Sequence, residues 1–296
     1  MRQHKLLPIK SFENLRDRVD RLFKTGTNHP HKRAQKSLEL LPHALNTEIE
    51  IDYPGESIKE FLDFMTDALP DGEVYLFGGV LRDLALIGER AFNSDIDIVV
   101  EGNWDNCVNY IESLGARKNK FGGYRFHVAE WPIDIWNARE TWAIKQGLVE
   151  YKGIVSLTET TVLNWDAILM NWRSHTFICR KNYLESIQSG LLDIVLEKNP
   201  DPLGMAVRVF RHFCLKDAKK ITPSAIRYLA NCTKLYSFDE IRSREIRSYS
   251  NTVIKPSRYK FFQHFNFNED LDLASNYSIA IDAFNKKLGL EKASIV

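Results

Sequence analysis

Two consecutive glycines separate an apolar segment from a helical pattern, and this junction limits the possible folds more than any other feature of the chain. Residues 74–77 (Val-Tyr-Leu-Phe) predict a buried strand, and Gly78-Gly79 ends it. Residues 80–87 predict a short helix. A second strand is predicted over residues 95–100, where aspartates alternate with isoleucines before two valines. The order strand, helix, strand indicates a mixed α/β unit.

The segments around this junction complete the predicted fold class. Two more helices and two more strands are expected, over residues 57–69, 105–115, 124–130 and 133–136. The first of these helices has Ser57 at its N-cap, with Glu60 three residues later. From about residue 160 helical patterns dominate, whereas residues 1–45 show no clean periodicity. We therefore expect an α+β fold, with a mixed sheet and flanking helices followed by a helical region.

Acidic side chains alternate with apolar ones in two of the predicted strands. Because strand side chains alternate faces, Asp95 and Asp97 project together while Ile96 and Ile98 face a core. Asp134 also stands between two isoleucines. Neighbouring carboxylates repel each other, and divalent cations such as Mg²⁺ are the simplest compensation. Three carboxylates on adjacent strands are typical of a site that binds two metal ions for nucleotidyl transfer.

The glycine pair supplies a site for phosphate. Glycines between a strand and a helix let backbone amides approach phosphate, and the helix N-terminus favours negative charge. Arg82, one turn into the helix, can reach phosphate or pair with a strand carboxylate. Taken alone, Gly78-Gly79 is an ordinary tight turn and Arg82-Asp83 an ordinary surface pair. Their combination with two alternating aspartates is far more specific.

This combination resembles the head domain of transfer-RNA CCA-adding enzymes and bacterial poly(A) polymerases. The resemblance is carried by residues 77–83 (Phe-Gly-Gly-Val-Leu-Arg-Asp) and 95–97 (Asp-Ile-Asp). It continues through residues 121–126 (Phe-Gly-Gly-Tyr-Arg-Phe), and Asp134 and Arg139 match a carboxylate and an arginine of that family. The resemblance is strong up to residue 140 and weak from there to about residue 215.

The resemblance implies a polymerase beta-like nucleotidyltransferase head and a metal-dependent reaction. A nucleoside monophosphate would pass from a nucleoside triphosphate to a hydroxyl, with release of pyrophosphate. Asp95 and Asp97 would bind two Mg²⁺ ions, Asp134 would bind the catalytic one, and Gly78 and Gly79 would contact the triphosphate. The expected divisions are a basic N-terminal extension, the head, a helical neck and a helical C-terminal region, at residues 1–56, 57–155, 156–220 and 221–296.

Two segments depart from the family pattern. The family carries Arg-Arg-Asp-Phe-Thr, with arginine on the triphosphate and aspartate near the ribose, where residues 163–168 read Leu-Asn-Trp-Asp-Ala-Ile. Asp166 is therefore either a ribose contact or a helix brace. The family's base-selecting Glu-Asp-x-x-Arg corresponds to residues 200–204 (Pro-Asp-Pro-Leu-Gly), in which Asp201 either contacts nucleotide or caps a helix. Ordered addition of C, C and A with the usual amino-acid template is not expected.

The helix predicted after Asp201 carries two further candidates for nucleotide binding. Met205, Val209 and Phe213 form an apolar stripe, and Arg208 and Arg211 share another face. These arginines either replace the missing phosphate contacts or are simply solvated. We favour the nucleotide-facing interpretation, because the corresponding family helix also carries arginines.

Charge bears on the acceptor of the reaction. The formal net charge is only +1, but residues 1–40 hold ten Lys or Arg against four acidic residues, and residues 241–260 hold six against Glu245 alone. These basic ends fit RNA as a partner or are solvated helix faces. No apolar run approaches the roughly 18 residues of a membrane span, so we expect no membrane partner and a cytoplasmic location. The four cysteines have no zinc-site or disulfide spacing.

Three functions remain open from the sequence. The first is nucleotidyl transfer to the 3′ end of an RNA. The second is nucleotidylation of a protein or small molecule by a modifying enzyme or toxin. The third is a non-catalytic relative that binds nucleotide or RNA.

Overall fold

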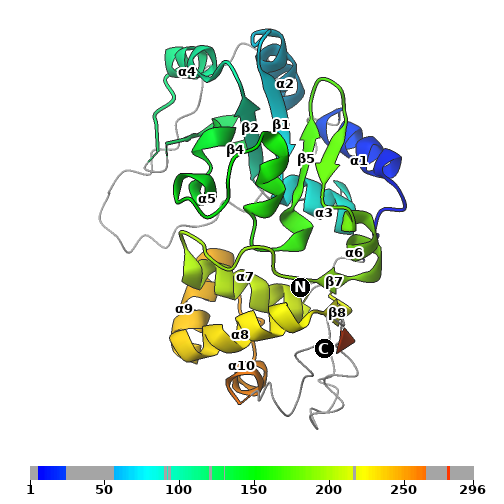
Figure 1. Cartoon of the computed structure of the whole chain (residues 1–296), viewed down its shortest axis with the longest axis vertical. Coiled ribbons are helices and arrows are strands. Elements are labelled where there is room, and N and C mark those ends of the chain that lie inside the picture. Colours follow the sequence, from blue (N-terminus) through cyan, green and yellow to red (C-terminus); the bar gives the residue numbers. More distant parts are fainter. Residues whose placement is uncertain are drawn as a thin grey trace. The chain divides into compact units, whose positions relative to one another are not determined.

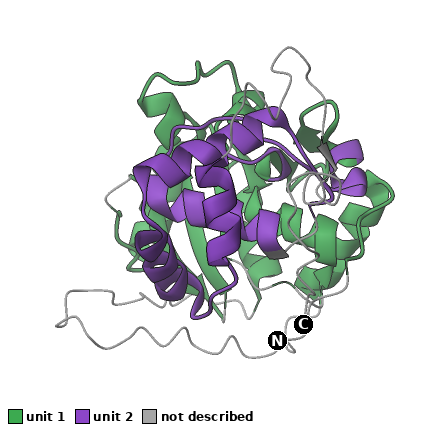
Figure 2. Ribbon diagram, turned by 90° about the horizontal axis from the view of Figure 1, so that it is seen from below, with its two compact units in different colours: residues 1–161, 166–184 green, residues 162–165, 185–296 purple. Residues whose placement is uncertain are grey.

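The computed structural model divides the chain into two compact units. Residues 1–161 and 166–184 form unit 1, and residues 162–165 and 185–296 form unit 2 (Figure 2). The structure describes residues 6–24, 57–89, 92, 95–119, 122–129, 131–215, 218–264 and 279–280. Most of the basic segment before residue 57, and Phe121 of the family motif, lie outside the described residues.

Unit 1 is built on a six-stranded sheet with the order β3-β4-β2-β1-β5-β6 (Figure 1). Its strands are β1 Glu73–Phe77, β2 Ile96–Glu101, β3 Tyr124–Val128, β4 Trp131–Asn137, β5 Ile168–Asn171 and β6 Phe177–Cys179. Its helices are α1 Phe12–Lys24, α2 Ile58–Asp67, α3 Gly79–Ile87, α4 Trp104–Ser113 and α5 Trp142–Lys145. Strands β2 and β4 run parallel, and the other neighbouring strands are antiparallel.

The elements predicted between residues 57 and 137 are confirmed. The hydroxyl of Ser57 accepts a hydrogen bond from the backbone of Glu60 at the start of α2, as its N-cap position predicts. Strands β5 and β6 are a correction, because the sequence indicates helix from about residue 160. β5 is buried along its whole length and so shows no alternation of apolar and polar residues. Such a short apolar run is not distinguishable from a buried helix by its pattern.

One face of the sheet is the main core of unit 1. Leu76, Ile96 and Ile98 are fully buried there, and burial of each such side chain stabilises the fold by about 1.5–3 kcal/mol. On the same face, Phe61 of α2 packs edge-to-face against Phe126 of β3. This core fixes the strands, so the residues between the buried ones necessarily point to the opposite face.

The opposite face carries both polar and apolar residues. Tyr75, Phe77 and Val99 are buried in a second apolar cluster together with Leu157. Phe77 is the register partner of Asp97 across β1 and β2. Asp97 therefore lies at the edge of an apolar cluster, on the face away from the main core.

Helix α1 belongs to unit 1, although the sequence analysis assigns residues 1–56 to an extension without periodicity. The backbone of Ile9 donates to Ala85 over 2.9 Å, and the guanidinium of Arg18 donates to the carbonyl of Leu84 over 2.7 Å. Leu15 and Val19 are fully buried. The helical pattern therefore exists between residues 12 and 24, but it is diluted when residues 1–45 are considered together.

Unit 2 is mainly helical. Its helices are α7 Pro202–Leu215, α8 Pro223–Leu235, α9 Phe238–Tyr249 and α10 Pro256–Gln263. A small sheet contains β7 Leu191–Leu192, β8 Lys220–Ile221 and β9 Ile279–Ala280, and α6 Tyr183–Ser189 continues from unit 1 into unit 2. The expected neck, residues 156–220, is therefore divided between the two units, and the expected C-terminal region belongs to unit 2. Within the described residues, no helix is both long enough and apolar enough to cross a membrane.

Candidate active site

Two of the three predicted carboxylates occupy paired positions on the parallel strands. Asp97 of β2 and Asp134 of β4 are direct register partners, so their side chains leave the sheet on the same face. Asp95 precedes β2 by one residue and is half-exposed. Asp97 and Asp134 thus lie on adjacent strands, as the sequence predicts, and Asp95 lies just before the first of them.

Arg125 joins this group and is a residue that the sequence analysis does not single out. It lies on β3 as the register partner of Asp134. Its Nη2 is 2.6 Å from Oδ2 of Asp95, and its Nη1 is 3.7 Å from Oδ2 of Asp134. The signal in the sequence is weak, a single arginine between the apolar Tyr124 and Phe126, and its meaning depends on β3 lying next to β4.

The pKa of Asp134 is changed by burial and by neighbouring charges. Burial raises the pKa of Asp134 above its usual range, Asp95 adds to the rise, and Arg125 opposes it. A nearby positive charge therefore stabilises the ionised form of Asp134. In this structure the guanidinium of Arg125 provides that charge.

The glycine turn lies beside the same carboxylates. Gly78 has a φ of 60°, a conformation that favours glycine, and Gly79 begins α3. A Cβ atom built on Gly79 would lie 3.8 Å from Oδ2 of Asp97. The backbone of the turn and the N-terminus of α3 therefore lie close to the carboxylates, where they can contact a phosphate group.

Arg82 is held away from solvent by two carboxylates. Its side chain pairs with Asp83, with Nε 2.9 Å from Oδ1, and with Asp166. Only 7% of Arg82 is exposed. Burial alone lowers the pKa of Arg82, but Asp166 and Asp83 hold it above its ordinary value. Arg82 thus pairs with a carboxylate of its own helix and with Asp166, not with a strand carboxylate, and nucleotide-binding roles for Arg82 and Asp166 stay predictions.

The remaining predicted nucleotide-binding residues lie in unit 2, where Asp201 and Arg211 form polar contacts. Asp201 accepts a hydrogen bond from the backbone of Gly204 over 3.0 Å at the start of α7, and it pairs with Arg244. Arg211 contacts Glu245, with Nη1 2.6 Å from Oε1. Arg208 is exposed on α7. These contacts brace unit 2, and a nucleotide-binding role for the three residues stays a prediction.

The donor set fits a hard divalent cation such as Mg²⁺, because Asp95, Asp97 and Asp134 offer carboxylate oxygens only. Within the described chain, no three or more His, Cys, Asp or Glu side chains are gathered closely enough to form a finished metal site. Arg125 contacts Asp95 and Asp134 in this arrangement. The chemistry of the donors therefore fits the metal.

The chain is similar to known proteins in sequence over one domain and in fold over a larger part. Residues 58–155 match the family model of the nucleotidyltransferase domain. The Thermotoga maritima CCA-adding enzyme complexed with tRNA is similar over 69% of this chain and 48% of its own, at 20% identity and a TM-score of 0.50. An apo CCA-adding enzyme is similar over 70% of this chain and 50% of its own, at 19% identity and a TM-score of 0.51.

These likenesses show the fold, and the chain spans about half the length of each solved enzyme. A comparison with curated protein sequences finds no match.

Proposed function

We propose that the chain transfers a nucleoside monophosphate from a nucleoside triphosphate to a hydroxyl of RNA, at its 3′ end, and releases pyrophosphate. Residues 58–155, which match the family model of the nucleotidyltransferase domain, would carry this reaction. The single observation that carries this proposal is the placement of Asp97 and Asp134 in register beside the turn at Gly79. Carboxylates next to a phosphate-binding turn are what this reaction requires, because a polyphosphate and its metal ions bind together.

The residues of the site fall into two groups, one that would bind the triphosphate and one that would bind the metal ions. The backbone of Gly78 and Gly79, with the N-terminus of α3, would bind the triphosphate. Asp95 and Asp97 would hold both Mg²⁺ ions and Asp134 one of them. When bound, these ions supply a lower pKa for the attacking hydroxyl and neutralise charge on the triphosphate and pyrophosphate.

Asp134 has a second role in this scheme. Its carboxylate lies on the same face as Asp97 and is only partly exposed, so it would orient the attacking hydroxyl and accept a hydrogen bond from it. The apolar cluster around Phe77, at the margin of the carboxylates, limits the access of water on that side.

RNA is the proposed acceptor for two reasons. Basic side chains are exposed on α9 and α10 and at their margins: Arg242, Arg247, Lys255 and Lys260. Such side chains favour a phosphate backbone. In addition, one of the similar solved enzymes is complexed with tRNA. Asp201 accepts a hydrogen bond from Gly204 and forms an ion pair with Arg244. These contacts support a mode of base selection different from the amino-acid template of CCA-adding enzymes.

The test is to incubate the full chain with Mg²⁺, each of the four labelled nucleoside triphosphates, total RNA and a protein extract, and then to sequence the RNA 3′ ends. We expect nucleotides added to RNA ends, and none with Asp95→Asn/Asp97→Asn. Label on protein alone would overturn the RNA acceptor and favour a protein-modifying enzyme. Binding of nucleotide without any transfer would favour a non-catalytic relative.

A further inference from the structure

The strongest unexplained feature of the site is Arg125, whose guanidinium contacts two of the three carboxylates proposed to bind metal. Its contacts are with Asp95 over 2.6 Å and Asp134 over 3.7 Å. We infer that Arg125 is a built-in counterion that the metal ions displace, and that its guanidinium then binds the triphosphate. This inference rests on the proposed function.

The position of Arg125 on the sheet makes the contact specific. Arg125 and Asp134 are register partners on antiparallel strands, so the arginine side chain leaves the sheet on the carboxylate face. Asp97 is in turn the register partner of Asp134. One backbone arrangement therefore fixes the guanidinium beside the carboxylates.

Exposure makes the contact easy to break. The side chains of Arg125 and Asp95 are 56% and 40% exposed, and that of Asp134 is 27% exposed. Ion pairs with such access to water are weak. A divalent cation attracts carboxylate oxygens more strongly than a single positive charge does. The cation and the guanidinium compete for the same oxygens, so the metal displaces Arg125.

The released guanidinium has a destination on the same face. The glycine turn lies beside Asp97, with a built Gly79 Cβ atom 3.8 Å from its carboxylate. The triphosphate proposed for that turn would lie within reach of an arginine on β3, and a guanidinium binds phosphate with two parallel hydrogen bonds. Arg82, the arginine next to the turn, is committed to Asp83 and Asp166. Nη2 of Arg82 lies 3.7 Å from the same built Cβ atom, so Arg82 is at the turn but held in its ion pairs, and Arg125 is the arginine that metal binding would release to the phosphate.

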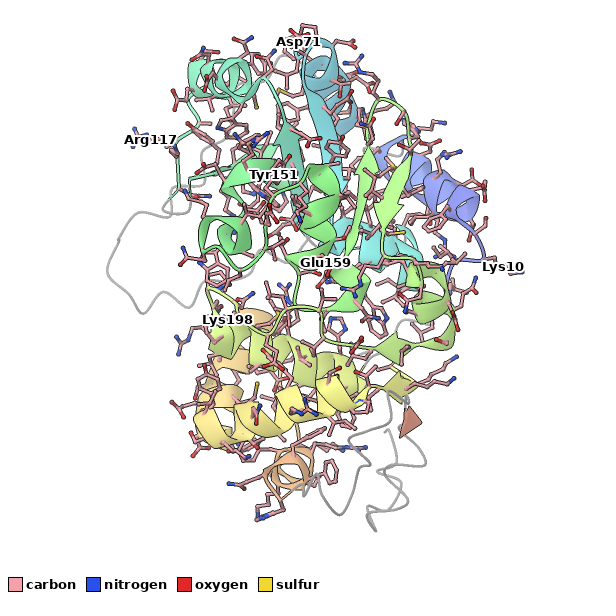
Figure 3. All side chains as sticks on the ribbon, in the orientation of Figure 1. Lys10, Asp71, Arg117, Tyr151, Glu159 and Lys198 are labelled. Atoms are coloured by element: carbon pink, nitrogen blue, oxygen red, sulfur yellow. The ribbon has the colours of Figure 1, made fainter. Side chains whose placement is uncertain are left out.

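The test uses the full chain and two ligands measured separately. Mn²⁺ binding is followed by electron paramagnetic resonance without nucleotide, and binding of a non-hydrolysable ATP analogue with Mg²⁺ is followed by calorimetry. Arg125→Gln removes the charge, and Arg125→Lys keeps the charge without the two-pronged geometry. The control is Arg117→Gln, which removes one exposed positive charge from the segment after α4 (Figure 3).

Arg125→Gln is expected to bind Mn²⁺ about 3–10-fold more tightly, because weak ion pairs and a like charge are removed. The same variant is expected to bind the ATP analogue about tenfold more weakly, through loss of a charged hydrogen-bond pair. Arg125→Lys should fall between, and Arg117→Gln should match the wild type. Mn²⁺ affinity that is unchanged or weaker in Arg125→Gln, or unchanged affinity for the analogue, overturns the inference. Failure of the wild type itself to bind Mn²⁺ would instead count against the proposed function.

Discussion

Asp97 and Asp134 lie side by side as register partners on β2 and β4, the parallel pair in the six-stranded sheet described for unit 1. Parallel neighbours carry paired residues on the same face, about 4.8 Å apart between strands. Two carboxylates at this spacing repel each other, and the structure compensates with Arg125 on the next strand. The carboxylates of Asp97 and Asp134 are therefore stabilised by a positive charge close to them on this face of the sheet.

Replacement of Asp97 by Asn tests whether this carboxylate binds metal. Asn keeps the shape but removes one anionic metal ligand, so transfer should fall by more than about 100-fold. The melting temperature should be unchanged or slightly higher, because repulsion with neighbouring carboxylates is relieved. Initial rates of nucleotide incorporation and thermal unfolding measure the two effects.

Asp71→Asn is the matched control for Asp97→Asn. Asp71 is exposed in the turn between α2 and β1 (Figure 3), so its loss removes the same charge from unit 1 without touching the carboxylates. It should retain full activity. If Asp97→Asn were as active as Asp71→Asn, the proposal that Asp97 binds metal would be wrong.

The sequence predicts this pair because alternation is a local property. Ile96 and Ile98 must be buried, so the aspartates beside them must face the other way. The role of Arg125 is not local, because it follows from β3 pairing with β4. For the same reason Arg82 could not be assigned: its partner Asp166 lies far along the chain, before a strand whose four buried residues carry no periodic signal.

The two glycines of the turn should respond differently to alanine. Gly78 has a φ of 60°, so Gly78→Ala should destabilise the chain by about 1–3 kcal/mol. Gly79 lies in α3, where alanine is favoured over glycine by up to about 1 kcal/mol. Its new methyl group, however, would lie 3.8 Å from Asp97 and occupy space proposed for phosphate.

We therefore expect Gly79→Ala to keep its stability and to raise the KM for nucleoside triphosphate about tenfold, the size of one lost phosphate contact. Urea unfolding and initial rates over a range of nucleotide concentrations separate the two variants. If Gly79→Ala kept the wild-type KM, the turn would not be the phosphate site.

The ion pair between Arg82 and Asp166 is a candidate brace for the turn. Asp166→Ala removes one of two carboxylates from a nearly buried arginine, so a loss of about 3 kcal/mol is expected. Arg82→Met should also destabilise the chain. The double variant should cost about 1–3 kcal/mol less than the sum, because the two residues act through one contact.

The competing role for Asp166 is recognition of the ribose. That role predicts a different result for Asp166→Asn, namely a smaller preference for ATP over dATP at unchanged stability. Comparison of incorporation rates for the two nucleotides decides between the brace and the ribose contact. We expect the preference to be kept and the urea midpoint to fall.

Arg211, which the sequence assigns to nucleotide binding, contacts Glu245 in unit 2. Glu245 is fully buried, and its Oε1 also accepts from the backbone of Val253 over 3.0 Å. Arg211→Met would leave this carboxylate buried without its cation, so unfolding should be easier by about 3 kcal/mol while the KM for nucleotide is unchanged. Arg208→Met, at an exposed position of the same helix, should alter stability by no more than about 0.5 kcal/mol. Urea midpoints and nucleotide KM values for both variants provide the comparison. A normal midpoint with a raised KM for Arg211→Met would show that Arg211 contacts nucleotide after all.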